Sequence, residues 1–485
     1  MCRLTVEVAS KPMDSKPWLE DACSLVDSYR KGEISPSEAL DECLSAIEGS
    51  ELNAFSHVDT EPAREAAKSA DVSLPFGGVP IGIKELEAVE GWPFTEASLV
   101  FADRVATYTT TEAKRLRAAG AVLAGQTTAS EFGGINVTST RLHGTTRNPW
   151  DTALTPGGSS GGSAAAVGGG LLPIASGSDG GGSIRIPASF TGTFGLKSTF
   201  GRIPKGPHAH QTPLTVTLGC LSRSVRDTAR WFDVCNGYDP RDTLSLPKVG
   251  GWEDGLGSHL GELRGKRAAI AVDLGVAIVH PRVAEHVTAA AEALVKDAGL
   301  ERVDIAVQFP PALFEWAMSN LVTLRADLGE RYPACEQEFT MEIMFGMNIG
   351  HHQYDLAMAG TAESFRIRVN ETMADLLEQV DFIFASTNPD LAFEAEGPVP
   401  MKVGDRDLLT ELGNVVAAGA NQGALTFPAN LAGNPAVSIP VGLVDDLPVG
   451  MQVIGRHHEE ELLLDLALVA ERERPWPLVA PRAPR

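Results

Sequence analysis

Hydrophobic residues recur at helical spacing near the start of the chain. Residues 35–38 read Ser-Pro-Ser-Glu, which is a capping box with proline at the first helical position. The apolar side chains that follow are three and four residues apart, at Ala39, Leu40, Cys43, Leu44 and Ile47. This spacing predicts a helix with one buried face, within a first region, residues 1–75, that is expected to be largely helical.

Farther along, short apolar runs alternate with helical patterns. Strands are predicted at residues 79–84, 122–124, 268–272, 303–307, 382–385 and 437–440, and helices at 111–119, 283–294 and 460–471. Such alternation is typical of an α/β protein. No linker rich in proline and glycine divides the chain, so we expect one domain over residues 1–485.

The centre of the chain has a different character. Residues 155–205 are crowded with glycine, serine and alanine and are almost free of charge. Glycine at this density lets backbone approach backbone, or lets backbone N–H groups converge on an anion. We divide the rest of the chain into a core region at residues 76–205, which contains this stretch, a variable region at 206–375, and a C-terminal part of the core at 376–485.

Composition narrows the range of partners. The 485 residues are 43% hydrophobic and 21% charged, as in ordinary globular proteins, and the formal net charge is −23. Such a charge repels phosphates and anionic lipids, so neither nucleic acid nor a membrane is an expected partner. No apolar run is long enough for a signal peptide or a membrane span.

The six cysteines lie far apart and form no C-x-x-C pair. This arrangement argues against a zinc site and a disulfide framework and favours a reducing, cytoplasmic compartment. No cluster of histidine and carboxylate residues has metal-ligand spacing, so neither a metal nor another cofactor is expected.

Three segments carry the candidate chemistry. Residues 78–84 read Gly-Val-Pro-Ile-Gly-Ile-Lys, residues 155–163 read Thr-Pro-Gly-Gly-Ser-Ser-Gly-Gly-Ser, and residues 177–187 read Gly-Ser-Asp-Gly-Gly-Gly-Ser-Ile-Arg-Ile-Pro. Together and in this order they resemble the amidase-signature family of serine hydrolases. Further segments that resemble the family in its order lie at 125–132, 147–150, 194–197, 431–436 and 447–455.

The resemblance covers most of the chain and implies the amidase-signature fold, a central twisted mixed β-sheet covered by helices on both faces. It implies that Lys84 is the catalytic lysine, Ser159 the bridging serine and Ser183 the nucleophile. A serine hydroxyl needs a base to remove its proton, and a lysine that burial keeps neutral can be that base. The family also has a cis peptide bond before the residue matching Ser159.

The glycines before the nucleophile suit an oxyanion hole. Without side chains, successive backbone N–H groups can point at the oxygen that becomes negative during attack. The expected donors are the backbone N–H groups of Gly180, Gly181, Gly182 and Ser183. Ser160, Asp179 and Arg185 are expected to hold these loops by hydrogen bonds and charge pairing rather than to react.

Three positions depart from the usual family pattern. Glu85 follows the lysine where aspartate is usual, Lys197-Ser198-Thr199 replaces Lys-Pro-Thr, and Glu96 stands in a pocket-side loop where glycine is common. The first of these departures is expected to change how Lys84 is held.

Plainer interpretations exist for each segment. Lys84 alone suggests a strand-end lysine that reaches solvent and pairs with Glu85. Residues 157–161 alone suggest a tight turn or helix cap, and they also fit the G-x-S-x-G nucleophile elbow. That elbow needs a preceding strand and a downstream histidine, whereas proline and threonine precede this segment and the pairs at 351–352 and 457–458 resemble surface histidines.

Two other functions share the fold. One is a homologue that has lost the chemistry and only binds. The other is the glutamine-hydrolysing subunit of a tRNA-dependent amidotransferase, which needs partner subunits.

The substrate is indicated only by one apolar stretch. Residues 309–347 contain nine bulky apolar side chains: Phe309, Phe314, Trp316, Met318, Phe339, Met341, Met344, Phe345 and Met347. They either line the substrate pocket or form ordinary helix core. If they line the pocket, the substrate is a small apolar or aryl amide, with esters and carbamates (urethanes) as further substrates because all pass through the same oxyanion. Family members are often homodimers, so the resemblance also allows a homodimer.

Overall fold

The computed structural model describes residues 16–209 and 214–481 of the chain. Its strands, in chain order, are β1 (Phe55–Val58), β2 (Pro80–Lys84), β3 (Val122–Thr127), β4 (Ser139–Thr140), β5 (Gly144–Thr145), β6 (Ile174–Asp179), β7 (Phe194–Lys197), β8 (Thr217–Ser222), β9 (Arg267–Ile270), β10 (Glu301–Arg302), β11 (Phe382–Ser386), β12 (Lys402–Val403), β13 (Arg406–Asp407), β14 (Ala436–Val444) and β15 (Leu447–Ile454).

The α-helices, in the same order, are α1 (Ala22–Lys31), α2 (Pro36–Glu48), α3 (Thr60–Lys68), α4 (Thr111–Ala118), α5 (Gly161–Gly168), α6 (Arg185–Thr191), α7 (Val225–Cys235), α8 (Leu260–Leu263), α9 (Pro281–Asp297), α10 (Leu313–Leu328), α11 (Met341–Gln353), α12 (Leu356–Gln379), α13 (Leu408–Leu412), α14 (Val415–Ala420), α15 (Phe427–Ala432) and α16 (Glu460–Glu473).

One mixed sheet of 11 strands runs through the molecule in the order β1-β3-β2-β6-β8-β7-β14-β15-β11-β9-β10. The pairs β2–β3, β2–β6, β9–β11 and β9–β10 are parallel, and the central strands from β6 to β11 pair antiparallel. The predicted α/β class with a central mixed sheet is confirmed.

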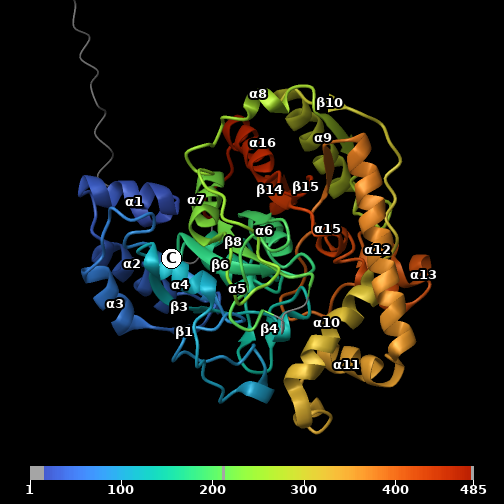
Figure 1. Cartoon of the computed structure of the whole chain (residues 1–485), viewed down its shortest axis with the longest axis horizontal. Coiled ribbons are helices and arrows are strands. Elements are labelled where there is room, and N and C mark those ends of the chain that lie inside the picture. The colour runs from blue at the N-terminus through green and yellow to red at the C-terminus, as the bar shows by residue number, and fades with distance from the viewer. Residues whose placement is uncertain (1–15, 210–213, 482–485) are drawn as a thin grey trace, which may run out of the picture.

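Two groups of helices pack on this sheet. Helices α5 and α6 contact each other and strands β6 and β15 respectively, while α7, α16 and α9 pack together over β8, β14 and β11. Figure 1 shows α1 to α3 on one side of the molecule, in blue, and the gold and orange helices α10 to α12 on the opposite side. The α10–α12 group comes from the region predicted to be variable.

Most predicted elements are present. The capping box begins α2, where the Ser35 hydroxyl accepts from the Glu38 N–H and the Glu38 side chain accepts from the Ser35 N–H. Ala39, Leu40 and Cys43 are buried on the inner face of that helix. The helices predicted near 111, 283 and 460 are α4, α9 and α16, and five of the six predicted strands are β2, β3, β9, β11 and β14.

The strand predicted at residues 303–307 is wrong. The strand that pairs with β9 here is β10, which ends at Arg302, and one further bond joins the Val303 N–H to the Ala268 carbonyl at 2.9 Å. Val303, Ile305 and Val307 do pack against the core, so the alternation correctly marks a half-buried face. Alternation reports which side chains are buried, whereas a strand also requires a neighbouring backbone for its hydrogen bonds.

The apolar stretch at 309–347 divides into two groups rather than forming one wall. Phe339 and Met347 lie in a small buried cluster with Phe101, whereas Met341 and Phe345 are exposed. The side chain of Phe314 lies outside the described residues. The stretch therefore contributes both buried core and exposed surface, and helix core describes only part of it.

Candidate active site

Lys84 is the last residue of β2, and its side chain is fully buried. Its Nζ donates to the Ser159 Oγ at 2.8 Å and to the Ser178 Oγ at 2.9 Å. The alternative in which Lys84 reaches solvent beside Glu85 is therefore wrong. The buried amino group is instead held by two serine hydroxyls.

Ser178 and Ser176 come from β6, the parallel neighbour of β2. The Ser176 Oγ accepts from the backbone N–H of Lys84 at 2.8 Å. Two residues apart on a strand, both serines face the same side, so the strand period of two is the signal that could have found Ser178. Neither serine is among the predicted site residues, because no strand is predicted within the glycine-rich centre.

Ser159 lies on the loop that leads into α5, and the peptide bond between Gly158 and Ser159 is cis, as the resemblance implies. The neighbouring Ser160 is fully buried, and its Oγ donates to the Ser178 carbonyl at 3.3 Å. The Ser160 N–H donates to the Ser183 carbonyl at 3.3 Å. These bonds join the loop of Ser159 to the loop of Ser183, so the structure brings the three predicted catalytic residues into one place.

The glycine loop before Ser183 is held from outside by other segments. The Trp316 Nε1 of α10 donates to the Gly180 carbonyl at 2.7 Å, and the Thr426 Oγ1 donates to the Gly181 carbonyl at 2.5 Å. A Cβ at Gly181 would come within 2.6 Å of the Trp316 ring, and Gly182 has φ of +124°. Both positions therefore require glycine.

One predicted oxyanion donor is already engaged. The Gly182 N–H donates to the Asp179 Oδ1 at 2.7 Å, so the same N–H is not available to an oxyanion. The carboxylate uses this bond to hold the turn, which sequence spacing alone does not reveal. The donors that remain are the N–H groups of Gly180, Gly181 and Ser183.

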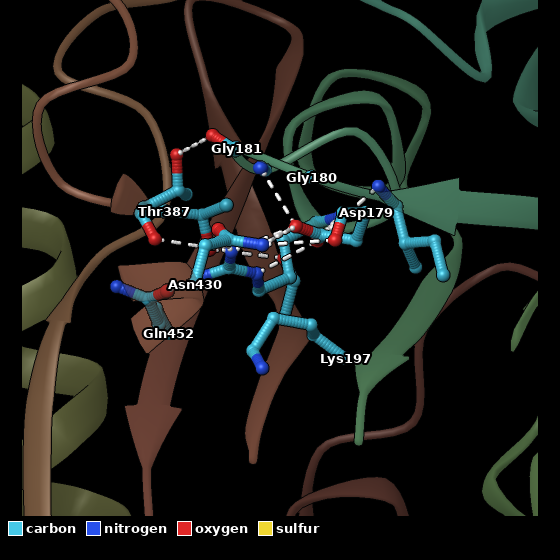
Figure 2. A network of polar contacts seen from close by, with 12 residues as sticks. Asp179, Gly180, Gly181, Lys197, Thr387, Asn430 and Gln452 are labelled. Carbon is cyan, nitrogen blue, oxygen red and sulfur yellow. Dashed lines mark hydrogen bonds and ion pairs between the residues drawn. The ribbon is translucent and has the colours of Figure 1, made fainter. Parts of the chain in front are cut away.

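Asp179 and Arg185 form a fully buried ion pair, with Arg185 Nε 2.9 Å from Asp179 Oδ2 and Nη2 2.9 Å from Oδ1. The Asn430 Nδ2 also donates to Asp179 Oδ1 at 2.9 Å, and Figure 2 shows Asn430 facing Asp179. The Arg185 Nη1 donates to the Gln452 side chain. Both charges of the pair therefore have partners, as a buried ion pair requires.

Electrostatics favour a neutral lysine. Burial lowers the pKa of Lys84 to about 7, although the carboxylates of Glu87 and Asp179 act in the opposite direction. Burial alone would raise the pKa of Asp179, but the Arg185 ion pair and hydrogen bonds hold it well below its ordinary value. Near neutral pH the site therefore combines an ionised Asp179 with a Lys84 that is uncharged in a substantial fraction of molecules.

Glu85 and Glu96, which depart from the usual family pattern, both bind other side chains. The Glu85 Oε1 accepts from the Thr95 hydroxyl and lies 2.6 Å from His143 Nε2. Glu96 adopts a positive φ of 50° and pairs with Arg104 at 2.5 Å. Glu85 thus braces the pocket-side loop instead of neutralising Lys84.

Within the described ranges, no group of three or more histidine, cysteine, aspartate or glutamate side chains is arranged to hold a metal ion. Five cysteines are described, all free and buried, and Cys2 lies outside the described residues. No helix in the described part of the chain is long and apolar enough to cross a membrane. The histidines at 351–352 and 457–458 are exposed, as the sequence predicts.

Known proteins share this sequence pattern over most of the chain. The family model described as Amidase matches residues 38–464. The chain is 33% identical over 478 residues to the A subunit of the glutamyl-tRNA(Gln) amidotransferase of Chloroflexus aggregans, covering 92% of this chain and 94% of that relative.

Solved structures show the same fold. A bacterial aryl acylamidase of the amidase signature family superposes with a TM-score of 0.87 at 26% identity, covering 97% of this chain and 100% of that chain. A 6-aminohexanoate cyclic dimer hydrolase superposes with a TM-score of 0.85 at 27% identity, covering 96% of this chain and 100% of that one. The chain therefore belongs to the amidase family, and it is a hydrolase of carbon–nitrogen bonds other than peptide bonds.

Proposed function

We propose that the protein is a free-standing amidase that cleaves small apolar or aryl amides through Ser183, Ser159 and Lys84. The observation that carries this proposal is the 2.8 Å bond from the buried Lys84 Nζ to the Ser159 Oγ, on a loop bonded to that of Ser183. A lysine in that position can take a proton from Ser183 by way of Ser159.

The reaction then follows in two stages. The Ser183 Oγ attacks the carbonyl carbon, and its proton passes through the Ser159 hydroxyl to the neutral Nζ of Lys84. The N–H groups of Gly181 and Ser183, with Gly180, stabilise the oxyanion. The C–N bond breaks as the proton returns to the departing amine, and water releases the acyl group from Ser183 by the same route.

Apolar side chains next to these loops support an apolar or aryl substrate. Trp316 stacks on Phe427 at 4.7 Å between ring centroids, and both rings pack directly against Gly181, where an added Cβ would lie 2.6 Å from the Trp316 ring and 3.0 Å from the Phe427 ring. Leu86 packs against Gly133, and Ile343 packs against Gly134. The solved aryl acylamidase supports the same substrate class. Esters and carbamates are expected as further substrates because they share the oxyanion.

The experiment replaces Ser183 by alanine. We expect Ser183→Ala to abolish hydrolysis of aryl amides and covalent labelling by a fluorophosphonate probe, with an unchanged circular dichroism spectrum. The control is Ser45→Ala, which changes an exposed serine on α2 and should retain both hydrolysis and labelling. Labelling or turnover that persists in Ser183→Ala would assign the nucleophile to another serine.

A second candidate function is the glutamine-hydrolysing subunit of a tRNA-dependent amidotransferase. The identity of 33% to the amidotransferase relative favours it. Two observations argue against it. The surroundings of Gly181 are apolar, whereas a glutamine pocket must bind the charged α-amino and α-carboxylate groups of its substrate. The net charge of −23 also repels tRNA. The isolated chain should hydrolyse aryl amides such as acetanilides and not glutamine. Glutaminase activity that emerges only with partner subunits would favour the second candidate.

We also infer that the chain forms one domain and that the protein resides in a reducing compartment. Strands from both ends of the chain, β1 and β15, belong to the same sheet, which supports a single folding unit over residues 16–481. The five free buried cysteines are compatible with a cytoplasmic location. Size-exclusion chromatography with light scattering would decide between monomer and homodimer.

A further inference from the structure

Two glutamates are buried together behind the active-site strand. Glu87 follows β2 and is 3% exposed, and Glu112 in the first turn of α4 is fully buried. Neither is part of the signature segments. Two carboxylates do not share a buried site without a cation or a proton, because burial and their mutual repulsion both penalise the second charge.

Each carboxyl group has one satisfied and one unsatisfied oxygen. The Ser176 Oγ donates to Glu87 Oε1 at 2.6 Å, and the Trp231 Nε1 donates to Glu112 Oε1 at 2.8 Å. Glu87 Oε2 and Glu112 Oε2 are both buried and have no hydrogen-bond donor among the described residues. The Thr110 N–H, at the start of α4, donates to the Ala88 carbonyl at 2.9 Å, which brings the Glu112 helix against the segment of Glu87, and each carboxyl group affects the pKa of the other. One proton between these two oxygens would satisfy both.

We propose that Glu112 is protonated and donates to Glu87, so that the pair places one fixed negative charge behind Lys84 and sets the pH at which Lys84 becomes a base. This inference rests on the proposed role of Lys84. Glu87 and Glu112 are positioning residues, because they act through Lys84 and touch no substrate. The Ser176 hydroxyl and the Trp231 N–H each donate to an Oε1 atom, so the Oε2 atoms of both glutamates are left for the shared proton.

The connection to Lys84 is a chain of two hydrogen bonds. The backbone N–H of Lys84 donates to the Ser176 Oγ, which itself donates to Glu87. Burial lowers the pKa of Lys84 and the carboxylate of Glu87 raises it. Burial raises the pKa of Glu112 well above its ordinary value and that of Glu87 less far, which agrees with the proton residing on Glu112.

The other ionisable groups around the pair leave this charge in place. They are Arg115 from α4, Cys220 from β8 and Cys235 from α7. Burial keeps both thiols neutral by raising the pKa of each. The Arg115 guanidinium donates to the backbone carbonyls of Cys235, Gly237 and Tyr238.

Two isosteric variants distinguish the effect of Glu87 on the pH profile from that of Glu112. In Glu87→Gln a carboxylate that raises the pKa of Lys84 disappears, so the rise of kcat/KM with pH should move to lower pH by about one unit. In Glu112→Gln the amide can still donate to Glu87 and accept from Trp231, so the charge stays and the pH profile should keep its position. An equal shift in both variants, or no shift in Glu87→Gln, would overturn the proposal.

An infrared measurement tests the proton without using activity. The difference spectrum of wild type minus Glu112→Gln at neutral pH should contain the carbonyl band of a protonated carboxylic acid, and absence of that band would overturn the pair. If either glutamine variant misfolds, the Glu87→Leu, Glu112→Leu double variant replaces both partners and should show the lower-pH profile. Failure of the proposed function is distinguishable, because then Lys84→Ala retains its activity whatever the infrared band shows.

Discussion

Among single residues, Lys84 shows how burial creates a base. A lysine at a strand end usually reaches solvent, yet here β3 and β6 flank β2 and the side chain ends among serine hydroxyls. The aspartate usual at the next position is replaced by Glu85, whose carboxylate is occupied by Thr95 and His143. The Nζ of Lys84 is therefore bonded to hydroxyls rather than to this carboxylate, and its pKa falls to about 7.

Lys84→Ala should separate amides from activated esters. Without the base, we expect the amide rate to fall by about 100-fold or more, because an amide's amine must be protonated as it leaves. An activated ester needs no such proton and should lose less. The rise of rate with pH around 7 should also disappear. Rates on matched aryl amides and esters across neutral and alkaline pH measure both effects, and equal losses with an intact pH profile would show that Lys84 is structural.

Among the helices and strands, α10 connects the variable region to the catalytic loop. Its Trp316 holds the Gly180 carbonyl, which turns the N–H of Gly181 on the same peptide plane to the opposite side. The sequence leaves open whether the apolar stretch that contains Trp316 lines the pocket or forms helix core. Within the described residues, Trp316 is the one residue of that stretch with a side-chain hydrogen bond to the glycine loop. Its indole nitrogen, rather than its apolar surface, makes that bond.

Trp316→Phe keeps most of the aromatic surface and removes the N–H donor. We expect kcat to fall about 5- to 10-fold, as for one lost hydrogen bond, with a smaller change in KM. Trp476→Phe is a matched control, because the Trp476 Nε1 also donates to a backbone carbonyl, that of Arg223, and its ring also stacks on a phenylalanine. Steady-state kinetics on an aryl amide distinguish the two. A change confined to KM would mean that Trp316 acts only as a wall.

For the molecule as a whole, burial of Lys84 lowers the free energy of unfolding. The strand order places β2 and β6 side by side, with β8 beyond β6, so Lys84 is enclosed on the inside of a large sheet. An unfolded chain solvates the ammonium and keeps its proton up to a pH of about 10.4, whereas the folded chain releases it at about 7. Between these values the unfolded state binds more protons, so the Lys84 contribution to stability rises with pH.

Lys84→Met should therefore stabilise the fold near neutral pH. We expect a gain in the free energy of unfolding on the order of 1–2 kcal/mol after the lost hydrogen bonds to Ser159 and Ser178, and the gain should shrink toward a pH of about 10. Urea unfolding of both proteins at neutral and alkaline pH measures it. A gain that does not change with pH would show that the folded protein leaves the pKa of Lys84 at its ordinary value.

The chemistry-bearing segments and their order were predictable from the amino-acid sequence. Each of these segments is a continuous stretch of sequence: a glycine run, a serine loop, or an apolar strand that ends in lysine. Each can therefore be recognised from neighbouring residues alone. The capping box of α2 and most core strands were predictable for the same reason, because helical and strand periods are properties of neighbouring residues.

The groups that surround this chemistry depend on the fold. Ser178, Glu112, Trp316 and Thr426 reach the site from four separate segments, and hydrogen bonds across as many as 245 residues hold them there. Periodicity carries no information about such distant pairs. The same limit made Gly182 look like an oxyanion donor and residues 303–307 look like a strand, because each outcome depends on which hydrogen-bond partner the fold provides.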